Sequence, residues 1–96
     1  MVLDLVYIYM DGCGPCDAMY PVIEEFNSSR PDVSVYKFPF LSEEQVVVEL
    51  KKEFGIESIP FFIAYADGNL LSSRLGYATA AELSAMFDHQ QAVEAV

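Results

Sequence analysis

The 96-residue chain contains no tryptophan, a single histidine and only two cysteines. Basic residues are also few, because five lysines and arginines stand against fifteen acidic residues and give a formal net charge of −10. An acidic surplus of this size repels nucleic acid and anionic membrane surfaces. No apolar run approaches the length of a membrane span, and Asp4 interrupts the one run that could start a signal peptide. We therefore expect a cytoplasmic protein that binds neither nucleic acid nor membrane.

Length and composition indicate one domain. Hydrophobic residues make up 53% of the chain, which suffices for a core without disulfide staples or a structural metal. No internal repeat, linker or low-complexity segment interrupts the sequence. We expect residues 1–96 to fold as a single domain, and nothing in the sequence requires more than a monomer.

The two cysteines stand in the segment Cys13-Gly14-Pro15-Cys16, where an apolar strand pattern gives way to a helical one. A cysteine at the start of a helix lies near unpaired backbone N–H groups and the positive end of the helix dipole, which favours thiolate over thiol. The thiolate is the form that attacks disulfides. Gly14 leaves the approach to Cys13 open, and Pro15 suits an early helical position because its missing N–H costs nothing there. The motif therefore predicts a reversible dithiol/disulfide pair.

Two other roles compete for this cysteine pair. A structural disulfide would close a loop of only four residues, to which the chain-entropy model assigns roughly 2 kcal/mol before strain is subtracted. A zinc site would need two further ligands, yet there is no second cysteine pair and the only histidine, His89, lies near the far end. Redox exchange is favoured over both, and no metal is expected.

Apolar periodicity predicts alternating strands and helices along the chain. The first strand pattern is almost wholly apolar, as expected for a strand buried on both faces. Pro21 falls inside the first helical pattern and should remove one backbone hydrogen bond and bend that helix. The strands are expected at residues 2–10, 33–38, 61–66 and 69–75, and the helices at residues 15–27, 42–54 and from 79 onward.

Local signals mark where several of these elements begin and end. Two capping-box patterns start helices, a glycine stops one, and an Asp-Gly pair predicts an antiparallel hairpin. These signals are Ser42 with Gln45, Thr79 with Glu82, Gly55, and Asp67-Gly68. Helical spacing also predicts the inward side chains of the last two helices. They are Val46, Val47, Leu50 and Phe54, followed by Leu83, Met86, Phe87 and Val93.

Taken in order, these features resemble the thioredoxin-like superfamily over nearly the full length of the chain. The resemblance rests on the Cys-Gly-Pro-Cys motif, a proline inside the following helix, an Ile-Pro pair before the third strand, the hairpin, and a glycine after it. Here these are Cys13 to Cys16, Pro21, Ile59-Pro60, Asp67-Gly68 and Gly76, with Lys37 where thioredoxins have a lysine behind the active site. The resemblance implies an α/β fold with a four-stranded mixed sheet, the order β-α-β-α-β-β-α, and helices on both faces.

The resemblance also implies a substrate-binding surface beside the dithiol. Ile59-Pro60 matches a segment that carries a cis-proline in the family, and Gly76 matches a glycine beside the substrate groove. X–Pro bonds adopt cis far more readily than other peptide bonds, and this proline would leave the preceding backbone free to pair with an incoming peptide. An ordinary trans-proline at the first residue of a strand is the alternative. Gly12 and Tyr77 complete the expected substrate contacts.

Three departures separate this chain from the family pattern. Gly12 stands where thioredoxins usually have a tryptophan, and Tyr7 stands where they bury an aspartate that takes part in proton transfer at the second cysteine. Only 12 residues precede Cys13, whereas thioredoxins begin with an extra strand and helix. We expect an altered contact surface around the dithiol and a different route of proton transfer at the second cysteine. We also expect a minimal core of glutaredoxin size.

The motif and the resemblance together predict a protein-disulfide reductase. Cys13 would attack a substrate disulfide to form a mixed disulfide, and Cys16 would then attack Cys13 and release the reduced substrate. The expected partners are disulfide-containing proteins and a reductase of the thioredoxin-reductase type, which would restore the dithiol. No bound cofactor is required.

Charges near the motif are expected to tune it. Asp11 and Asp17 flank the cysteines, and negative charge disfavours a thiolate, which predicts a less acidic Cys13 and a reductant rather than an oxidant. If both carboxylates point into water, the effect is screened. Lys37 is either a buried charge near Cys16, as the resemblance implies, or an exposed strand residue.

Two other functions stay open at the level of sequence. A glutaredoxin-like enzyme would use glutathione as its reductant. Small size favours it, whereas the Gly-Pro pair between the cysteines and the scarcity of basic residues for the carboxylates of glutathione oppose it. A binding subunit would use the same surface for docking with incidental redox activity, which the loss of the tryptophan and of the buried aspartate makes more credible.

Overall fold

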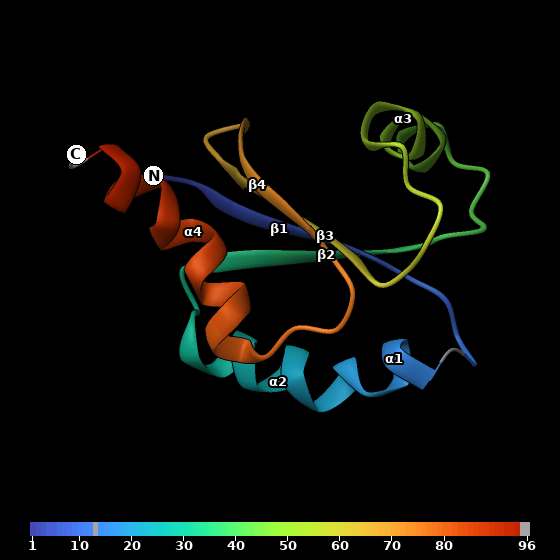
Figure 1. The fold of residues 1–96 in the computed structure, drawn as a ribbon, viewed down its shortest axis with the longest axis horizontal. Coiled ribbons are helices and arrows are strands. Elements are labelled where there is room, and N and C mark those ends of the chain that lie inside the picture. Colours follow the sequence, from blue (N-terminus) through green and yellow to red (C-terminus); the bar gives the residue numbers. More distant parts are fainter. Residues whose placement is uncertain (13, 95–96) are drawn as a thin grey trace.

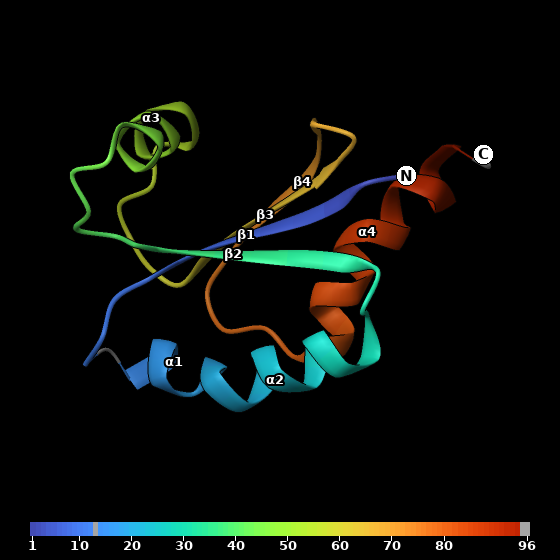
Figure 2. The same cartoon turned by 180° about the vertical axis from the view of Figure 1, so that it is seen from behind.

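The computed structural model describes residues 1–12 and 14–94, and it describes side chains only as far as Asp88. A four-stranded sheet carries helices on both faces (Figures 1 and 2). The strands are β1 (Leu3–Tyr9), β2 (Val33–Pro39), β3 (Phe61–Ala66) and β4 (Asn69–Leu75). The helices are α1 (Gly14–Asp17), α2 (Met19–Ser29), α3 (Gln45–Phe54) and α4 (Ala80–Glu94).

The sheet has the order β2-β1-β3-β4 and mixes two kinds of pairing. β1 is parallel to β2, whereas β3 is antiparallel to both β1 and β4. Ile8 pairs with Phe61 and Phe61 pairs with Leu75, so the end of β1, the start of β3 and the end of β4 lie at one edge of the sheet. This is the α/β fold that the sequence predicted. It brings the loop after β1, the loop before β3 and the loop after β4 to the same end of the molecule.

The central strand β1 buries side chains on both faces, as its nearly continuous apolar pattern predicted. Leu5 and Tyr7 belong to a core with α2 and α4, whereas Val6 and Ile8 belong to a second core with α3. Figure 1 shows the same division, with α3 on one face of the sheet and α1 and α2 on the other. The alternation of side chains along a strand therefore fixes which residues of β1 lie under the cysteine motif.

The helix expected at residues 15–27 is divided into α1 and α2 at Ala18. Pro21 has no N–H to donate to the carbonyl oxygen of Asp17, and its ring crowds that carbonyl. α1 therefore ends at Asp17. Ala18 still has helical backbone angles (φ −66°, ψ −16°), and its N–H donates to the carbonyl oxygen of Gly14 at 3.1 Å. The predicted bend is thus an interruption of the helix, and α2 continues to Ser29.

Helix α3 begins later than its capping-box pattern predicted. The hydroxyl of Ser42 accepts the N–H of Glu44 at 3.1 Å, only two residues on, so a tight turn uses the group that was expected to cap the helix. Glu44 occupies the N-cap position with extended backbone and no side-chain hydrogen bond, and the helix starts at Gln45. Val47 is fully buried, but Val46 is 44% exposed. The predicted Ser42 cap and the predicted burial of Val46 were therefore wrong.

The other local signals are confirmed by hydrogen bonds and backbone angles. The N–H of Thr79 donates to Glu82 Oε1 at 2.9 Å, and the N–H of Glu82 donates to Thr79 Oγ1 at 3.1 Å, which is a complete capping box. Asp67 and Gly68 have φ of 50° and 80°, as a two-residue hairpin turn requires. Gly55 ends α3 in a left-handed conformation.

A β-bulge interrupts the pairing of β3 with β4. Ala64 pairs with Ser72 and Tyr65 pairs with Leu70, so Leu71 is an extra residue in β4. Leu71 packs against the core of α2 and α4, while Leu70 is exposed. The unpaired residue of β4 is thus an apolar one that the core covers.

Within residues 1–12 and 14–94, no helix combines the length and the apolar character that a membrane crossing needs.

Candidate functional site

The cysteine segment follows the central strand at the edge where three loops meet. Asp11 and Gly12 form the turn after β1, and α1 begins at Gly14. Cys13, the predicted attacking cysteine, lies outside the described residues. Cys16 is only 3% exposed, whereas Gly14 and Pro15 are exposed. The second cysteine is therefore covered by the protein, while the described residues around it in the motif, Gly14 and Pro15, face solvent.

Tyr7 supplies a neutral polar group beneath the motif. Its side chain is buried, and its hydroxyl donates to the main-chain carbonyl oxygen of Cys16 at 3.4 Å. Its ring lies nearly parallel to that of Phe62, with centroids 5.0 Å apart, and 5.5 Å from that of Tyr9. Tyr7 thus places a phenol against α1. The family resemblance implies an aspartate at the position of Tyr7.

The Ile59–Pro60 and Gly76–Tyr77 segments reach the same end of the sheet. The Ile59–Pro60 peptide bond is cis, as the resemblance implied. The N–H of Gly76 donates to the carbonyl oxygen of Pro60 at 2.8 Å, which joins the two segments directly. Ile59 makes no main-chain hydrogen bond to another residue of the described part of the chain. Tyr77 is 48% exposed. The predicted groove residues are therefore adjacent to each other, with an exposed ring beside them.

Lys37 is an exposed strand residue and not a buried charge. Its side chain lies on the α2 face of the sheet, where Nζ is 6.0 Å from the ring centroid of Tyr9 and 5.5 Å from that of Tyr20. The hydroxyl of Tyr20 donates to Asp11 Oδ1 at 3.1 Å. The pKa of the Tyr20 phenol is raised above its usual value, chiefly by this hydrogen bond and by the negative charge of Asp11. The negative charge of Asp17 raises it further, but more weakly. Lys37 therefore belongs to a cluster of side chains beside the motif, formed with Tyr9, Tyr20 and Asp11.

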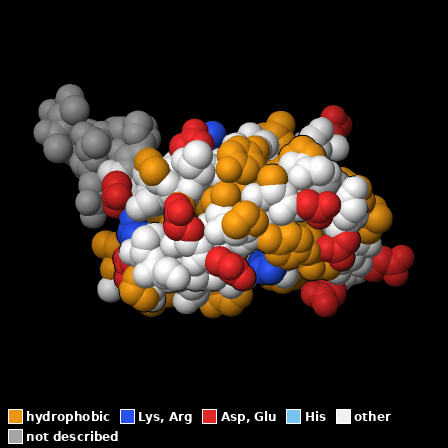
Figure 3. All heavy atoms as spheres, turned by 90° about the horizontal axis from the view of Figure 1, so that it is seen from below, with side chains coloured by type: hydrophobic (Ala, Val, Ile, Leu, Met, Phe, Trp, Pro, Cys, Tyr) orange, Lys and Arg blue, Asp and Glu red, His pale blue; other side chains and the backbone are white. Residues whose placement is uncertain are grey.

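Tyr20 was missed by the sequence prediction. It follows Cys16 by one helical turn, but its partner Asp11 precedes the motif, and only the path of the turn between β1 and α1 brings the two together. Asp17, the other predicted tuning residue, is the exposed last residue of α1. Acidic side chains gather at the α1 end of the molecule, seen from the side of α1 and α2 in Figure 3.

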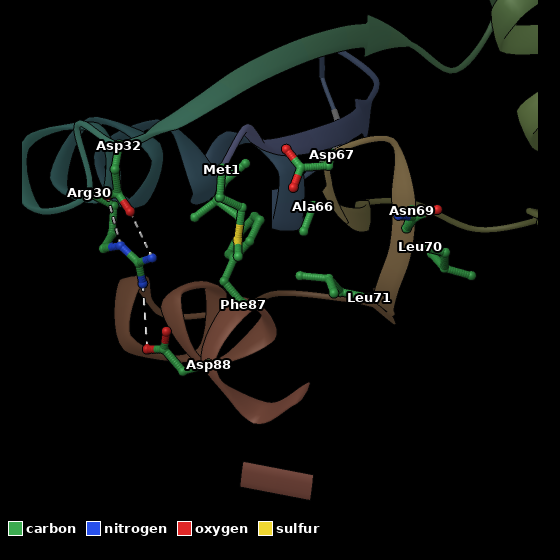
Figure 4. Close-up of a pocket in the computed structure, with 11 residues that line it drawn as sticks. Met1, Arg30, Asp32, Ala66, Asp67, Asn69, Leu70, Leu71, Phe87 and Asp88 are labelled. Carbon is green, nitrogen blue, oxygen red and sulfur yellow. Dashed lines mark hydrogen bonds and ion pairs between the residues drawn. The ribbon is translucent and has the colours of Figure 1, made fainter. Parts of the chain in front are cut away.

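A hollow of about 520 Å³ lies at the opposite end of the sheet (Figure 4). Arg30 closes one side, with Nε and Nη2 donating to the carboxylate of Asp32 at 3.0 and 3.1 Å and Nη1 lying 3.5 Å from Asp88 Oδ2. Leu3 and Phe87 contribute apolar walls. None of the site residues predicted from the sequence lines this hollow. The guanidinium of Arg30 is already paired with the carboxylates of Asp32 and Asp88.

The described side chains contain no group of three or more histidine, cysteine or acidic residues that could hold a metal ion. Cys13 and the side chain of His89 lie outside that set.

A mixed sheet with a Cys-x-x-Cys segment after its central strand is typical of thiol–disulfide oxidoreductases. A family model described as thioredoxin matches residues 2–89. Thioredoxin from Alicyclobacillus acidocaldarius is 37% identical over 82 residues, covering 84% of this chain and 74% of that protein. Thioredoxin from Mycoplasmoides gallisepticum is 30% identical over 79 residues, covering 82% of this chain and 75% of that protein. The chain therefore belongs to the thioredoxin family.

Solved structures agree on the fold. The crystal structure of Chlamydomonas reinhardtii thioredoxin f2 superimposes with a TM-score of 0.72 at 26% identity, covering 93% of this chain and 80% of that one. The family supports a thiol–disulfide redox enzyme as the general class of activity. The chain spans about three quarters of the length of the two relatives compared above.

Proposed function

We propose that this chain reduces disulfide bonds in proteins through the pair Cys13 and Cys16. The observation that carries the proposal is the burial of Cys16 in the first turn of α1. Cys13 precedes it by three residues in the sequence and follows Gly12, which is exposed. In such a pair the outer sulfur meets the substrate and the covered sulfur reacts only within the molecule. Family membership supports the same division of labour.

The reaction proceeds by two thiol–disulfide exchanges. The thiolate of Cys13 attacks one sulfur of the substrate disulfide, which forms a mixed disulfide and releases the other substrate sulfur as a thiolate that takes up a proton. Cys16 loses its proton and attacks the sulfur of Cys13, so the substrate leaves with both cysteines reduced. The enzyme then holds the Cys13–Cys16 disulfide, having given two electrons to the substrate.

The surface beside the motif suits an extended peptide. Ile59 has no main-chain hydrogen bond within the described residues, so its N–H and C=O are available to a strand-like substrate segment. A Cβ at Gly76 would stand in open space, since no described heavy atom beyond its two chain neighbours lies within 4 Å of that place. Tyr77 offers an exposed ring next to it. Main-chain pairing of this kind gives affinity with little dependence on the substrate sequence.

A reductase of the thioredoxin-reductase type is the partner that would return the dithiol to its reduced form. A reducing compartment such as the cytoplasm suits this cycle, because dithiols are kept reduced there. Glutathione is the less suitable reductant. Of the five basic residues, Arg30 and Arg74 already pair with carboxylates, and Lys51 donates to the carbonyl oxygen of Phe40 at 2.9 Å.

The test is insulin-disulfide reduction by the wild type and two variants. Cys13→Ser should abolish turnover, because no thiolate attacks the substrate. Cys16→Ser should also lose turnover but should accumulate a mixed disulfide, visible on a non-reducing gel and released by dithiothreitol. Full turnover by the Cys13→Ser variant would refute the assignment. Supplying either thioredoxin reductase with NADPH or glutathione as electron donor then separates the two types of reductase cycle.

A docking subunit whose redox activity is incidental is the second candidate. Tyr7 favours it, because a phenol in place of an acid gives the second cysteine a weaker proton acceptor. If the Cys13→Ser/Cys16→Ser double variant still supports the function of a partner protein, docking is the function and reduction is not.

A further inference from the structure

Tyr20 connects three elements beside the cysteine motif. It stands on α2, its hydroxyl donates to Asp11 in the turn after β1, and its ring lies 5.5 Å from Nζ of Lys37 on β2. The ammonium group attracts the face of the ring while the carboxylate accepts from its hydroxyl. The ring is therefore held at two places, although the residue is 51% exposed.

The hydrogen bond from Tyr20 restrains the turn that precedes Cys13. Asp11 and Gly12 are both exposed, and Gly12 has a φ of 80°, a conformation that glycine adopts without strain. Among the described side chains, only Tyr20 donates a hydrogen bond to the carboxylate of Asp11. That bond ties the turn to α2 across nine residues of sequence. An untied carboxylate on such a turn would sample many positions and act on the motif from a larger average distance.

We propose that Tyr20 is a positioning residue that holds the carboxylate of Asp11 in one place beside the motif and thereby makes the reactivity of Cys13 sensitive to that charge. The inference rests on the proposed use of Cys13 as the attacking thiol. Asp11 precedes Cys13 by two residues in the sequence. Because a fixed negative charge near a thiolate disfavours it, the tether should make Cys13 less acidic. Tyr20 does not touch the reacting sulfurs and acts only through Asp11.

The charged and titratable groups around Tyr20 come from each element packed against it. Asp17 lies on α1, Tyr9 on β1, Lys37 on β2, and Asp11 in the turn. The pKa of the Tyr20 phenol is raised, first by its hydrogen bond to Asp11, so the hydroxyl stays protonated and keeps donating throughout the range in which a cysteine titrates. The tether is therefore present on both sides of the Cys13 titration.

The experiment compares two substitutions that separate charge from tether. Asp11→Asn keeps an oxygen that accepts from Tyr20 but removes the charge, whereas Tyr20→Phe keeps the ring on Lys37 but removes the donor. Both are made in the full chain carrying Cys16→Ser, and the pKa of Cys13 is read from the pH dependence of its alkylation by iodoacetamide at low ionic strength.

With Tyr20 present, Asp11→Asn should lower that pKa by about 0.4 of a unit, roughly a 2.5-fold change in the thiolate-to-thiol ratio. In the Tyr20→Phe background, Asp11→Asn should shift the pKa of Cys13 by less than about half as much, because the untied carboxylate then acts from a larger average distance.

Asp17→Asn is the matched control, because no hydrogen bond joins Asp17 to Tyr20 among the described side chains. Its effect on the pKa of Cys13 should be the same in both backgrounds. An equal Asp11→Asn shift with and without the Tyr20 hydroxyl overturns the inference, as does an absence of any shift. Alkylation needs no disulfide substrate, so these outcomes are independent of the insulin assay and distinguish a failure of the tether from a failure of the proposed function.

Discussion

The N–H of Gly76 donates a 2.8 Å hydrogen bond to the carbonyl oxygen of Pro60. Gly76 has a φ of 98°, which side-chain-bearing residues rarely adopt, although no described heavy atom beyond its chain neighbours lies within 4 Å of a Cβ built there. Gly76→Ala should therefore lower the free energy of unfolding by about 1–2 kcal/mol through backbone strain alone. Urea unfolding measures this. Gly14→Ala is the matched control, since its surroundings are equally open and its φ is not positive. A loss of similar size in both variants would contradict the strain argument.

Tyr7→Phe removes the hydroxyl that donates to the carbonyl oxygen of Cys16 and keeps the ring that stacks on Phe62. We expect the free energy of unfolding of the reduced protein to fall by about 1 kcal/mol, the usual contribution of one buried hydrogen bond. Tyr36→Phe, at an exposed tyrosine on β2, should change it by less than about 0.5 kcal/mol. Chemical denaturation of both variants checks the difference, and equal losses would mean that the buried Tyr7 hydroxyl contributes no more to stability than an exposed one.

Two adjacent valines of α3 differ in burial and should respond differently to truncation. Val47 is fully buried, so Val47→Ala should lose about 2 kcal/mol from the two missing methyl groups and the cavity that they leave. Val46 is 44% exposed, so Val46→Ala should cost less than about 0.5 kcal/mol, helped by the better helix propensity of alanine. Thermal or urea unfolding of the pair tests the phase of the helix. Losses of similar size at both positions would agree instead with the sequence prediction that both valines are buried.

The pKa of the Glu82 carboxyl is held below its usual value, chiefly by the main-chain N–H of Thr79 and then by the guanidinium of Arg74. A depressed pKa in the folded state gives stability that is present above the unfolded value of about 4.3 and is lost as pH falls through the lower folded value. Glu82→Gln should therefore lower Tm at pH 7, and the difference from wild type should shrink as the pH falls below about 4. Glu24→Gln, an exposed change on α2, controls for general charge effects. A gap in Tm that is constant with pH would contradict the assignment.

The sequence predicted those parts of the fold whose signals are local and unambiguous. Asp67-Gly68 and the pair Thr79 and Glu82 specify geometry within a few residues, so their turn and cap form as expected. Ser42 failed as a cap because its hydroxyl can reach either of two nearby N–H groups, and the pattern does not say which.

The site was predictable only in part, for a related reason. The cysteine motif and Ile59-Pro60 are visible in the sequence because each is a short contiguous segment. The contacts of Lys37 depend on which face of β2 it occupies, and the Tyr20 to Asp11 bond depends on how a turn with a positive φ folds back on α2. Neither the face nor the path of the turn has a signal in residue spacing.

The extra leucine in β4 also bears on how this chain behaves when it is concentrated. β2 and β4 are the outer strands, and a flat outer strand is a template on which a second molecule can extend the sheet. The bulge at Leu71 twists one of these edges, and Pro39, which has no N–H to offer, closes the other. The backbone of Ile59, which we propose for substrate binding, is thus accompanied by two outer strands whose edges are less suited to pairing with a second copy of the chain.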